Sequence, residues 1–202
     1  DIFNVLGRRF PKAQIVFKKD SKGKIRWGIY QSAEKGITLT ENCPLHTKRA
    51  NLVANTLCNL FEKYGLSPFD FKRKKGFVRS VLIREGFSSG EMLLLLVCSK
   101  ASFKSEAEFC REITKIHPYI KSIVITESQS LKLTTGGNPR VIFGSGYIED
   151  TLSNLKFFIG YNTFYQINPL QTERLYSKAI DLANLNTSMM VLDAYCGIGT
   201  IA

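Results

Sequence analysis

Short apolar runs with strand-like patterning recur along most of the chain. Turn-forming residues separate them, and two neighbouring pairs are joined by Asp20-Ser-Lys-Gly23 and by Gly86-Phe-Ser-Ser-Gly90, the second a hairpin connection. The pattern predicts strands at residues 13–18, 25–31, 77–85, 91–99, 121–126, 141–143, 155–159 and 189–194, with a short extended piece at 38–44.

Three longer stretches have the spacing of amphipathic helices. Residues 105–116 form one candidate, and residues 169–184 form another that begins with Pro169, a residue favoured in the first helical turn. The third candidate covers residues 47–64 and has lysines opposite its apolar face. That face is expected to contain Leu52, Val53, Leu57, Leu60 and Phe61.

The order of the elements changes near residue 155. Before it, strands and helices alternate as in an α+β domain, whereas a helix, a strand and a glycine turn follow it, as at the start of an α/β domain. The sequence therefore predicts one domain over residues 1–155 and the N-terminal part of a second over 156–202. An α/β sheet needs further strands, so we expect the chain to be the front part of a larger enzyme.

The positive charge lies in the first half of the chain. Of a net charge of +11, residues 1–100 contribute 19 Lys+Arg against 8 Asp+Glu, and residues 101–202 contribute 9 against 9. The cations form runs such as Lys18-Lys19 and Lys72-Arg73-Lys74-Lys75. A segregated basic face is typical of proteins that bind polyanions, and it favours RNA or DNA over an ordinary solvated surface.

Composition narrows the class of protein further. The hydrophobic content of 44% and charged content of 22% fit a globular protein. The longest apolar run, Met92 to Cys98, is far shorter than the roughly 18 residues that span a bilayer. The five scattered cysteines suit a reducing compartment better than a disulfide framework. We expect a cytoplasmic protein, not bound to membranes and monomeric.

The glycine turn indicates a cofactor site. Asp193 ends an apolar run, and Gly197 and Gly199 follow two residues apart, which lets the backbone approach a ligand closely. The third glycine of a pyrophosphate fingerprint is missing, and Asp193 would repel phosphate. The pattern suits a cationic ligand such as the amino-acid end of S-adenosylmethionine, so it favours a methyltransferase over a dehydrogenase.

A second segment, Asn162 to Gln171, interleaves aromatic and amide side chains. Amides such as Gln166 can bind the edges of a base or of adenosine, and aromatics such as Phe164 can stack on them. An ordinary loop-to-helix entry with Asn168 as the helix cap is the alternative.

The two segments together resemble the S-adenosylmethionine-dependent RNA uracil-5-methyltransferases, which make 5-methyluridine in ribosomal or transfer RNA. FYQINPLQTERLY, followed by VLDAYCGIGT, is similar to that family's F-F-Q-V-N-x-x-Q-x-x-x-L-Y and L-D-L-Y-C-G-x-G. Asn42-Cys-Pro-Leu45 and the segment Gly76 to Arg84 also look like its central domain. The resemblance implies a central α+β domain that faces RNA, followed by the truncated start of an α/β, Rossmann-like class I methyltransferase domain.

The resemblance also implies roles for residues. Gln166 matches a glutamine that lines the cofactor and uracil pocket, Tyr195 an aromatic beside the adenosyl group, and Thr200 a polar position at a helix start. Asp193, Gly197 and Gly199 would form the cofactor turn itself. In the family, a cysteine thiolate adds to C6 of a flipped uracil, C5 takes the methyl group and a glutamate handles protons.

Those two catalytic residues are expected beyond residue 202, so the chain alone is expected to be inactive. Cys196 would belong to the cofactor loop and would not be the nucleophile. Cys43 matches the fourth cysteine ligand of the 4Fe-4S cluster that some members hold, with the other three before Asp1, although a plain buried cysteine explains it equally well. His46 and His117 have no ligand spacing and are expected at the surface or as caps.

The resemblance favours methylation of uridine C5 in RNA, with ribosomal RNA ahead of transfer RNA. Two rivals stay open. One is a class I methyltransferase that acts on another RNA atom or on protein. The other is a non-catalytic RNA-binding module with a degenerate cofactor fold.

Overall fold

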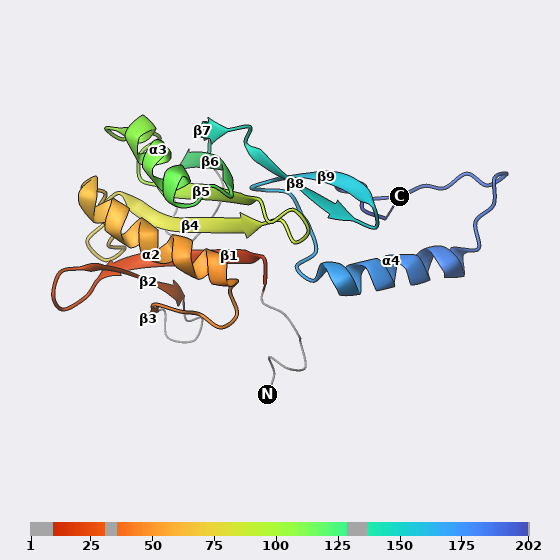
Figure 1. The fold of residues 1–202 in the computed structure, drawn as a ribbon, viewed down its shortest axis with the longest axis horizontal. Coiled ribbons are helices and arrows are strands. Elements are labelled where there is room, and N and C mark those ends of the chain that lie inside the picture. Colours follow the sequence, from red (N-terminus) through yellow and green to blue (C-terminus); the bar gives the residue numbers. More distant parts are fainter. Residues whose placement is uncertain (1–9, 31–35, 129–136, 202) are drawn as a thin grey trace.

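A mixed seven-stranded sheet forms the body of the protein (Figure 1). The structure is a computed structural model that describes residues 10–30, 36–128 and 137–201. Across the sheet the strand order is β3-β2-β1-β4-β5-β6-β7, and every neighbouring pair is antiparallel except β5 and β6. The strands are β1 (Lys12–Lys19), β2 (Ile25–Tyr30), β3 (Ile37–Thr40), β4 (Val78–Glu85), β5 (Met92–Cys98), β6 (Ile120–Glu127) and β7 (Pro139–Gly144).

Two helices cover one face of this sheet. Helix α2 (Lys48–Lys63) follows β3, and helix α3 (Glu106–Ile116) connects the parallel strands β5 and β6. Both bury their apolar faces in one core, where Phe61 and Phe109 stack with ring centroids 6.1 Å apart. Thr47 caps α2 by accepting a hydrogen bond from the Ala50 amide at 3.0 Å.

The opposite face of β4 and β5 is covered as well, which explains the continuous apolar sequence of β5. Leu93, on that face, packs with Ile148 and Ile159 from a separate two-stranded hairpin. This hairpin consists of β8 (Tyr147–Leu152) and β9 (Leu155–Gly160). Strands buried on both faces lose the polar alternation of half-exposed strands. Helix α4 (Pro169–Ala183) follows and extends away from the sheet (Figure 1).

The predicted elements largely match the observed ones, with three differences. Leu52, expected on the buried face of α2, is 57% exposed, while Val53, Leu57, Leu60 and Phe61 are buried. Strand β8 follows Gly146 and was not predicted, because its charged residues interrupt the apolar pattern. The sequence also indicates a break at Thr134-Thr-Gly-Gly-Asn-Pro139, ahead of the strand predicted at 141–143, and this break lies mostly outside the described residues.

The third difference is that residues 189–194 form no strand. The segment is apolar but solvent-exposed, with Met190 at 99% and Leu192 at 88% exposure. A strand is stabilised by backbone hydrogen bonds to a neighbouring strand, and no described strand pairs with this segment. The expectation of a strand there was therefore wrong for this structure, and a Rossmann-like second domain is not formed by the described residues.

Candidate functional site

Gln166, one of the predicted site residues, lies at a small pocket between the sheet and the segment that leads into α4. The pocket has a volume of about 20 Å³, close to the space of one water molecule. Gln166 is half-buried there. Its neighbours in the pocket wall are Pro11, Lys12, Arg84, Glu85, Ile148, Ile159, Tyr165 and Ile167.

The start of α4 fixes the position of Gln166 along the chain. Asn168 is the helix cap, and its side-chain oxygen accepts a hydrogen bond from the Gln171 amide at 3.4 Å. Pro169 follows in the first turn, where a missing N–H costs nothing. The capping alternative for Asn168 is therefore confirmed. Phe164 is 75% exposed, so it contacts little of the protein.

Tyr165 anchors the same segment from the inside. Its ring packs with Leu152, Phe157 and Tyr176. Burial, followed by the negative charge of the Asp150 carboxylate, raises the pKa of Tyr165 well above its usual range. The phenol therefore stays protonated, and its buried hydroxyl has no hydrogen-bond partner among the described residues.

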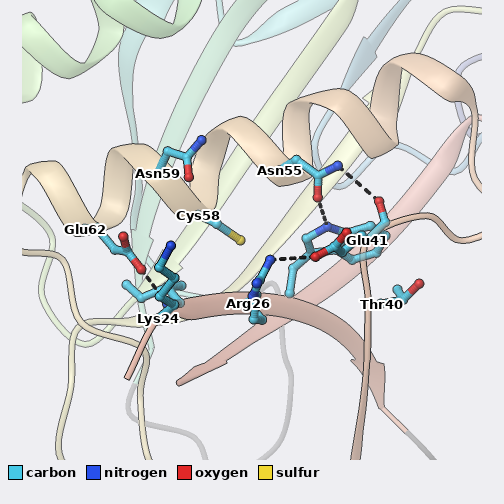
Figure 2. A pocket seen from close by; sticks show the side chains of 10 residues that line it. Lys24, Arg26, Thr40, Glu41, Asn55, Cys58, Asn59 and Glu62 are labelled. Carbon is cyan, nitrogen blue, oxygen red and sulfur yellow. Dashed lines mark hydrogen bonds and ion pairs between the residues drawn. The ribbon is translucent and has the colours of Figure 1, made fainter. Parts of the chain in front are cut away.

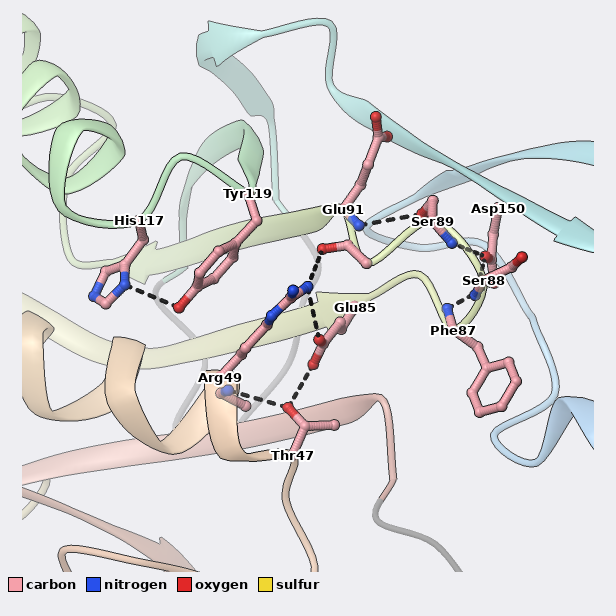
Figure 3. Close-up of polar contacts among 12 residues, drawn as sticks. Thr47, Arg49, Glu85, Phe87, Ser88, Ser89, Glu91, His117, Tyr119 and Asp150 are labelled. Carbon is pink, nitrogen blue, oxygen red and sulfur yellow. Dashed lines mark hydrogen bonds and ion pairs between the residues drawn. The ribbon is translucent and has the colours of Figure 1, made fainter.

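Asp150 in turn holds the hairpin between β4 and β5 (Figure 3). The residue is 1% exposed, and its carboxylate accepts hydrogen bonds from the amides of Phe87, Ser88 and Ser89 at 2.9, 2.8 and 3.2 Å. Hydrogen bonds to an ionised acceptor are stronger than neutral ones. Asp150 thus fixes the hairpin at residues 86–90 to strand β8.

A second polar network holds the other side of this hairpin (Figure 3). Arg49 of α2 donates to the Gly90 carbonyl at 3.1 Å and lies 3.8 Å from the Glu85 carboxylate. Its guanidinium also lies over the Tyr119 ring, 4.9 Å from the centroid. Thr47 donates to Glu85 at 2.5 Å. Glu85 is therefore engaged with α2 although it also reaches the wall of the Gln166 pocket.

The glycine turn exists as predicted, but it is exposed. Gly197 and Gly199 have φ angles of 60° and 75°, in the left-handed region that glycine adopts without strain. Tyr195 has a φ of 69° and is fully exposed, and Cys196 is exposed too. Asp193 is half-buried. These residues contact no described pocket, so the structure leaves their predicted cofactor roles untested.

The glycine turn nevertheless meets the segment of Gln166 through a shared apolar cluster. Ile198, between the two glycines, packs with the cluster that contains Tyr165 and Tyr176. The hydroxyl of Thr200 lies 3.2 Å from that of Tyr176. The two sequence motifs, some thirty positions apart, are thus neighbours in the fold, although Gln166 itself touches none of the glycine-turn residues in its pocket.

A larger pocket lies elsewhere, between α2 and the strands β2 and β3 (Figure 2). Its volume is about 250 Å³. Its charges are largely matched, because Arg26 pairs with Glu41 at 2.6 Å and with Asp20 at 3.2 Å. Burial raises the pKa of the Cys58 thiol in its wall to about 12, so that thiol is not a nucleophile at neutral pH. The pocket has no group suited to methyl transfer.

The cysteines of the described residues do not assemble a metal site. Cys43 is 5% exposed and packs in the core beneath α2. Among the described residues no group of three or more His, Cys, Asp or Glu side chains could hold a metal ion. The residues present therefore do not by themselves fit a four-thiolate cluster, and Cys43 as one ligand stays a prediction.

The two histidines are buried, contrary to the surface position expected for them. His46 stacks on Trp27 with ring centroids 6.0 Å apart, and burial lowers its pKa. His117 is the C-cap residue of α3, so the capping expectation holds, and its ring bridges the hydroxyls of Thr56 and Tyr119 at 2.8 and 2.9 Å. Both imidazole rings are thus buried structural groups.

Exposed lysines gather at the end of the sheet away from Gln166. Since β1 and β5 end there and β2 and β4 begin there, the connections around them lie together at the left of Figure 1. The acidic Asp20, Asp70 and Glu112 near this end already pair with Arg26, Arg73 and Lys63. The lysines that form no ion pair among the described residues are Lys18, Lys19, Lys22, Lys24, Lys72, Lys74, Lys75, Lys100 and Lys104.

Sequence reasoning missed three residues that hold the Gln166 segment or the hairpin at residues 86–90, namely Arg84, Tyr165 and Asp150. Arg84 gave little signal, because the strand Val78–Glu85 contains a second arginine, Arg79, and Arg84 does not stand out from it. Tyr165 belongs to the motif FYQINPLQTERLY, but nothing in the sequence assigns it a role of its own. For Asp150 no signal existed, since its buried position depends on the unpredicted strand β8.

Curated proteins of similar sequence match nearly the whole of this chain. An uncharacterised RNA methyltransferase of Listeria innocua is 33% identical over 180 residues, which are 89% of this chain and 40% of that protein. An uncharacterised RNA methyltransferase of Clostridium tetani is 32% identical over 208 residues, covering 100% of this chain and 45% of that protein. The chain thus spans less than half the length of these relatives. No protein-family model matches the sequence.

A solved structure has the same fold. The crystal structure of the Pyrococcus abyssi tRNA (uracil-54, C5)-methyltransferase, in complex with S-adenosyl-L-homocysteine, matches with a TM-score of 0.76. The match covers 96% of this chain and 45% of that chain at 22% sequence identity. No helix among the described residues is long and apolar enough to cross a membrane.

Proposed function

Since the chain is homologous to bacterial proteins named RNA methyltransferases, we propose that the full-length protein transfers a methyl group from S-adenosylmethionine to C5 of a uridine in RNA. The observation that carries the proposal is the meeting of two motifs in the fold. The cluster of Tyr165, Tyr176 and Ile198 joins the Gln166 segment to the glycine turn. Each motif alone also has a structural explanation, but their contact supports one shared site for the cofactor and the uracil.

Gln166 would bind the uracil or the adenosyl group at this site. Its side-chain amide offers both a donor and an acceptor, which matches the adjacent carbonyl and N–H groups on the edge of a uracil. The segment is rigid enough for this task, because Tyr165 is packed on one side and Asn168 caps α4 on the other. A fixed side chain loses little conformational entropy when it binds.

The glycine turn would hold S-adenosylmethionine, which supplies an electrophilic methyl group. The left-handed conformations at Gly197 and Gly199 leave open space where a Cβ would stand, so a ligand can approach the backbone. Asp193 would attract the cationic amino-acid end, and Tyr195 and Thr200 would contact the adenosyl part. The attacking cysteine and the glutamate base are proposed to lie beyond Ala202, in a second domain that begins near residue 156.

RNA would bind along the sheet from the Gln166 pocket to the lysines at the other end. Strand β4 connects the two ends, and its 8 residues span about 26 Å at roughly 3.3 Å each. Lysines that lack an ion pair lose little when they contact phosphates, and they release counterions. Several nucleotides of the RNA would thus contact the protein, and we propose ribosomal or transfer RNA as the substrate.

The Gln166→Ala variant of the full-length protein tests the proposal. We expect the rate of RNA methylation to fall by about 5- to 150-fold, since a lost hydrogen bond to a buried polar group costs about 1–3 kcal/mol. RNA retention on a native gel should stay near the wild-type value, because the lysines are unchanged. Asn59→Ala is the matched control, an exposed amide on α2. Loss of RNA retention with normal turnover would contradict the role given to Gln166.

Transfer to protein or to another RNA atom is the second candidate. The similarity to proteins named RNA methyltransferases favours RNA over protein as the substrate. Analysis of the methylated nucleoside separates C5 of uridine from the other RNA atoms.

A further inference from the structure

Two positive side chains lie directly opposite each other at the Gln166 pocket. Lys12 at the start of β1 pairs in register with Arg84 near the end of β4. Side chains of opposed residues in neighbouring strands lie on the same face, and like charges in this arrangement are destabilising. Both residues line the pocket that contains Gln166.

Arg84 is an unusual residue for a sheet interior. It is 7% exposed, and one terminal nitrogen donates to the Thr163 carbonyl at 2.5 Å. The Nε–H is buried and has no hydrogen-bond partner among the described residues. Neither Arg84 nor Lys12 forms an ion pair among the described residues. A buried cation without a compensating anion costs several kcal/mol.

The nearby carboxylates are already engaged with other groups. Glu85 accepts the hydrogen bond from Thr47 and lies beside Arg49. Glu91 accepts a hydrogen bond from the Glu149 amide at 2.9 Å. Asp150 is held by the three hairpin amides. The two cations therefore face a pocket without their own counter-ion.

We propose that Lys12 and Arg84 form an anion site that binds one phosphate of the RNA substrate at the mouth of the pocket beside Gln166, because the pocket interior has room for only about one water molecule. The inference rests on the proposed function and adds the position of a backbone contact to it. A phosphodiester brings the negative charge that the pair lacks. The exposed Lys12 ammonium donates to its oxygens, and the buried guanidinium of Arg84 attracts it by its charge. Gln166, in the same pocket wall, then meets the base or sugar attached to that phosphate.

An RNA phosphate fits the site better than the carboxylate of the cofactor does. The described residues of the glycine turn, Asp193 to Ile201, do not line the pocket. They contact the Gln166 segment on the side of Tyr176 instead. Lys12 is exposed, so a long polymer can reach it from solvent.

The test compares Lys12→Gln with wild type in the full-length protein, with Lys121→Gln as the matched control, an exposed lysine of β6. We expect Lys12→Gln to weaken RNA binding roughly 3- to 10-fold at about 0.1 M salt and to reduce the slope of log K against log salt by about 1. Affinity for S-adenosylmethionine should not change. An unchanged salt slope, or a loss confined to cofactor affinity, would overturn the proposal.

A neutral phosphate identifies the contact. Short substrate RNAs are made with one uncharged methylphosphonate at each position around the methylated uridine. At one position the wild-type protein should lose as much affinity as Lys12→Gln loses with unmodified RNA, and combining both changes should add nothing further. Fully additive losses at every position would refute the assignment.

Two results separate this inference from the proposed function. If the wild-type protein makes 5-methyluridine but Lys12→Gln binds RNA as wild type does, only the anion site is wrong. If the affinity losses from Lys12→Gln and from one methylphosphonate are not additive, but no 5-methyluridine forms, the anion site stands and the reaction was misassigned. Arg84→Lys keeps the charge and should retain the salt slope, whereas a slope reduced by about 1 would contradict a role for Arg84 as a cation.

Discussion

Replacing Asp150 by Asn should destabilise the protein far more than a near-isosteric change at the surface does. One carboxylate oxygen accepts hydrogen bonds from the Ser88 and Ser89 amides, and the other accepts one from the Phe87 amide. An asparagine keeps a single acceptor oxygen, so its NH2 group must face at least one backbone N–H. The residue is 1% exposed, and water cannot easily replace the lost partner.

The size of the effect follows from these contacts. A hydrogen bond to a charged group contributes about 1.5–3 kcal/mol, and a neutral one about 0.5–1.5 kcal/mol. Losing one bond and weakening two gives about 3 kcal/mol of lost unfolding free energy. With a urea m-value of about 2 kcal/mol/M, the midpoint should fall by roughly 1.5 M.

Urea unfolding followed by the fluorescence of Trp27, the single tryptophan, measures this midpoint. Asp181→Asn on the exposed surface of α4 is the control, and it should change stability by less than about 0.5 kcal/mol. If Asp150→Asn also changes stability by less than about 1 kcal/mol, the Asp150 carboxylate does not hold the hairpin and the reasoning is refuted.

The remaining predictions concern charge and pH. Replacing Lys72, Lys74 and Lys75 by Gln in the full-length protein should reduce the slope of log K against log salt for RNA by up to about 3. Filter binding from about 50 to 200 mM salt measures this slope. An unchanged slope would contradict RNA binding by the lysines at this end of the sheet. Burial lowers the pKa of His46, so the unfolded state binds a proton first as the pH falls below about 6.5, and stability should decrease with falling pH in that window. His46→Phe keeps the stack on Trp27 and should reduce that decrease, measured as the urea midpoint at pH 7.5 and 5.5. An equal decrease in both proteins would assign the pH dependence to other groups.

Local pattern predicted most of the elements up to α4 because their stabilising contacts are visible in the sequence. The spacing of Val53, Leu57 and Phe61 predicts α2, and Pro169 marks the start of α4. Leu52 follows the same spacing but lies at the edge of the helical face, so pattern alone cannot separate it from its buried neighbours.

The strand expected at 189–194 shows the limit of local pattern. Its sequence is suitable for a buried strand, yet strand formation depends on a pairing partner elsewhere in the chain. Prediction of the site from local pattern has the same limit. Gln166 was found from its motif, whereas the pairing of Lys12 with Arg84 depends on the register between β1 and β4, which single-sequence patterns do not specify.

The most direct test of the proposed function is the identity of the methylated nucleoside. The full-length protein is incubated with RNA and S-adenosylmethionine that carries an isotope-labelled methyl group, and the RNA is digested to nucleosides and separated by mass spectrometry. The account predicts label in 5-methyluridine, and a much weaker signal from the Gln166→Ala variant. Label in any other nucleoside, with none in 5-methyluridine, would contradict it.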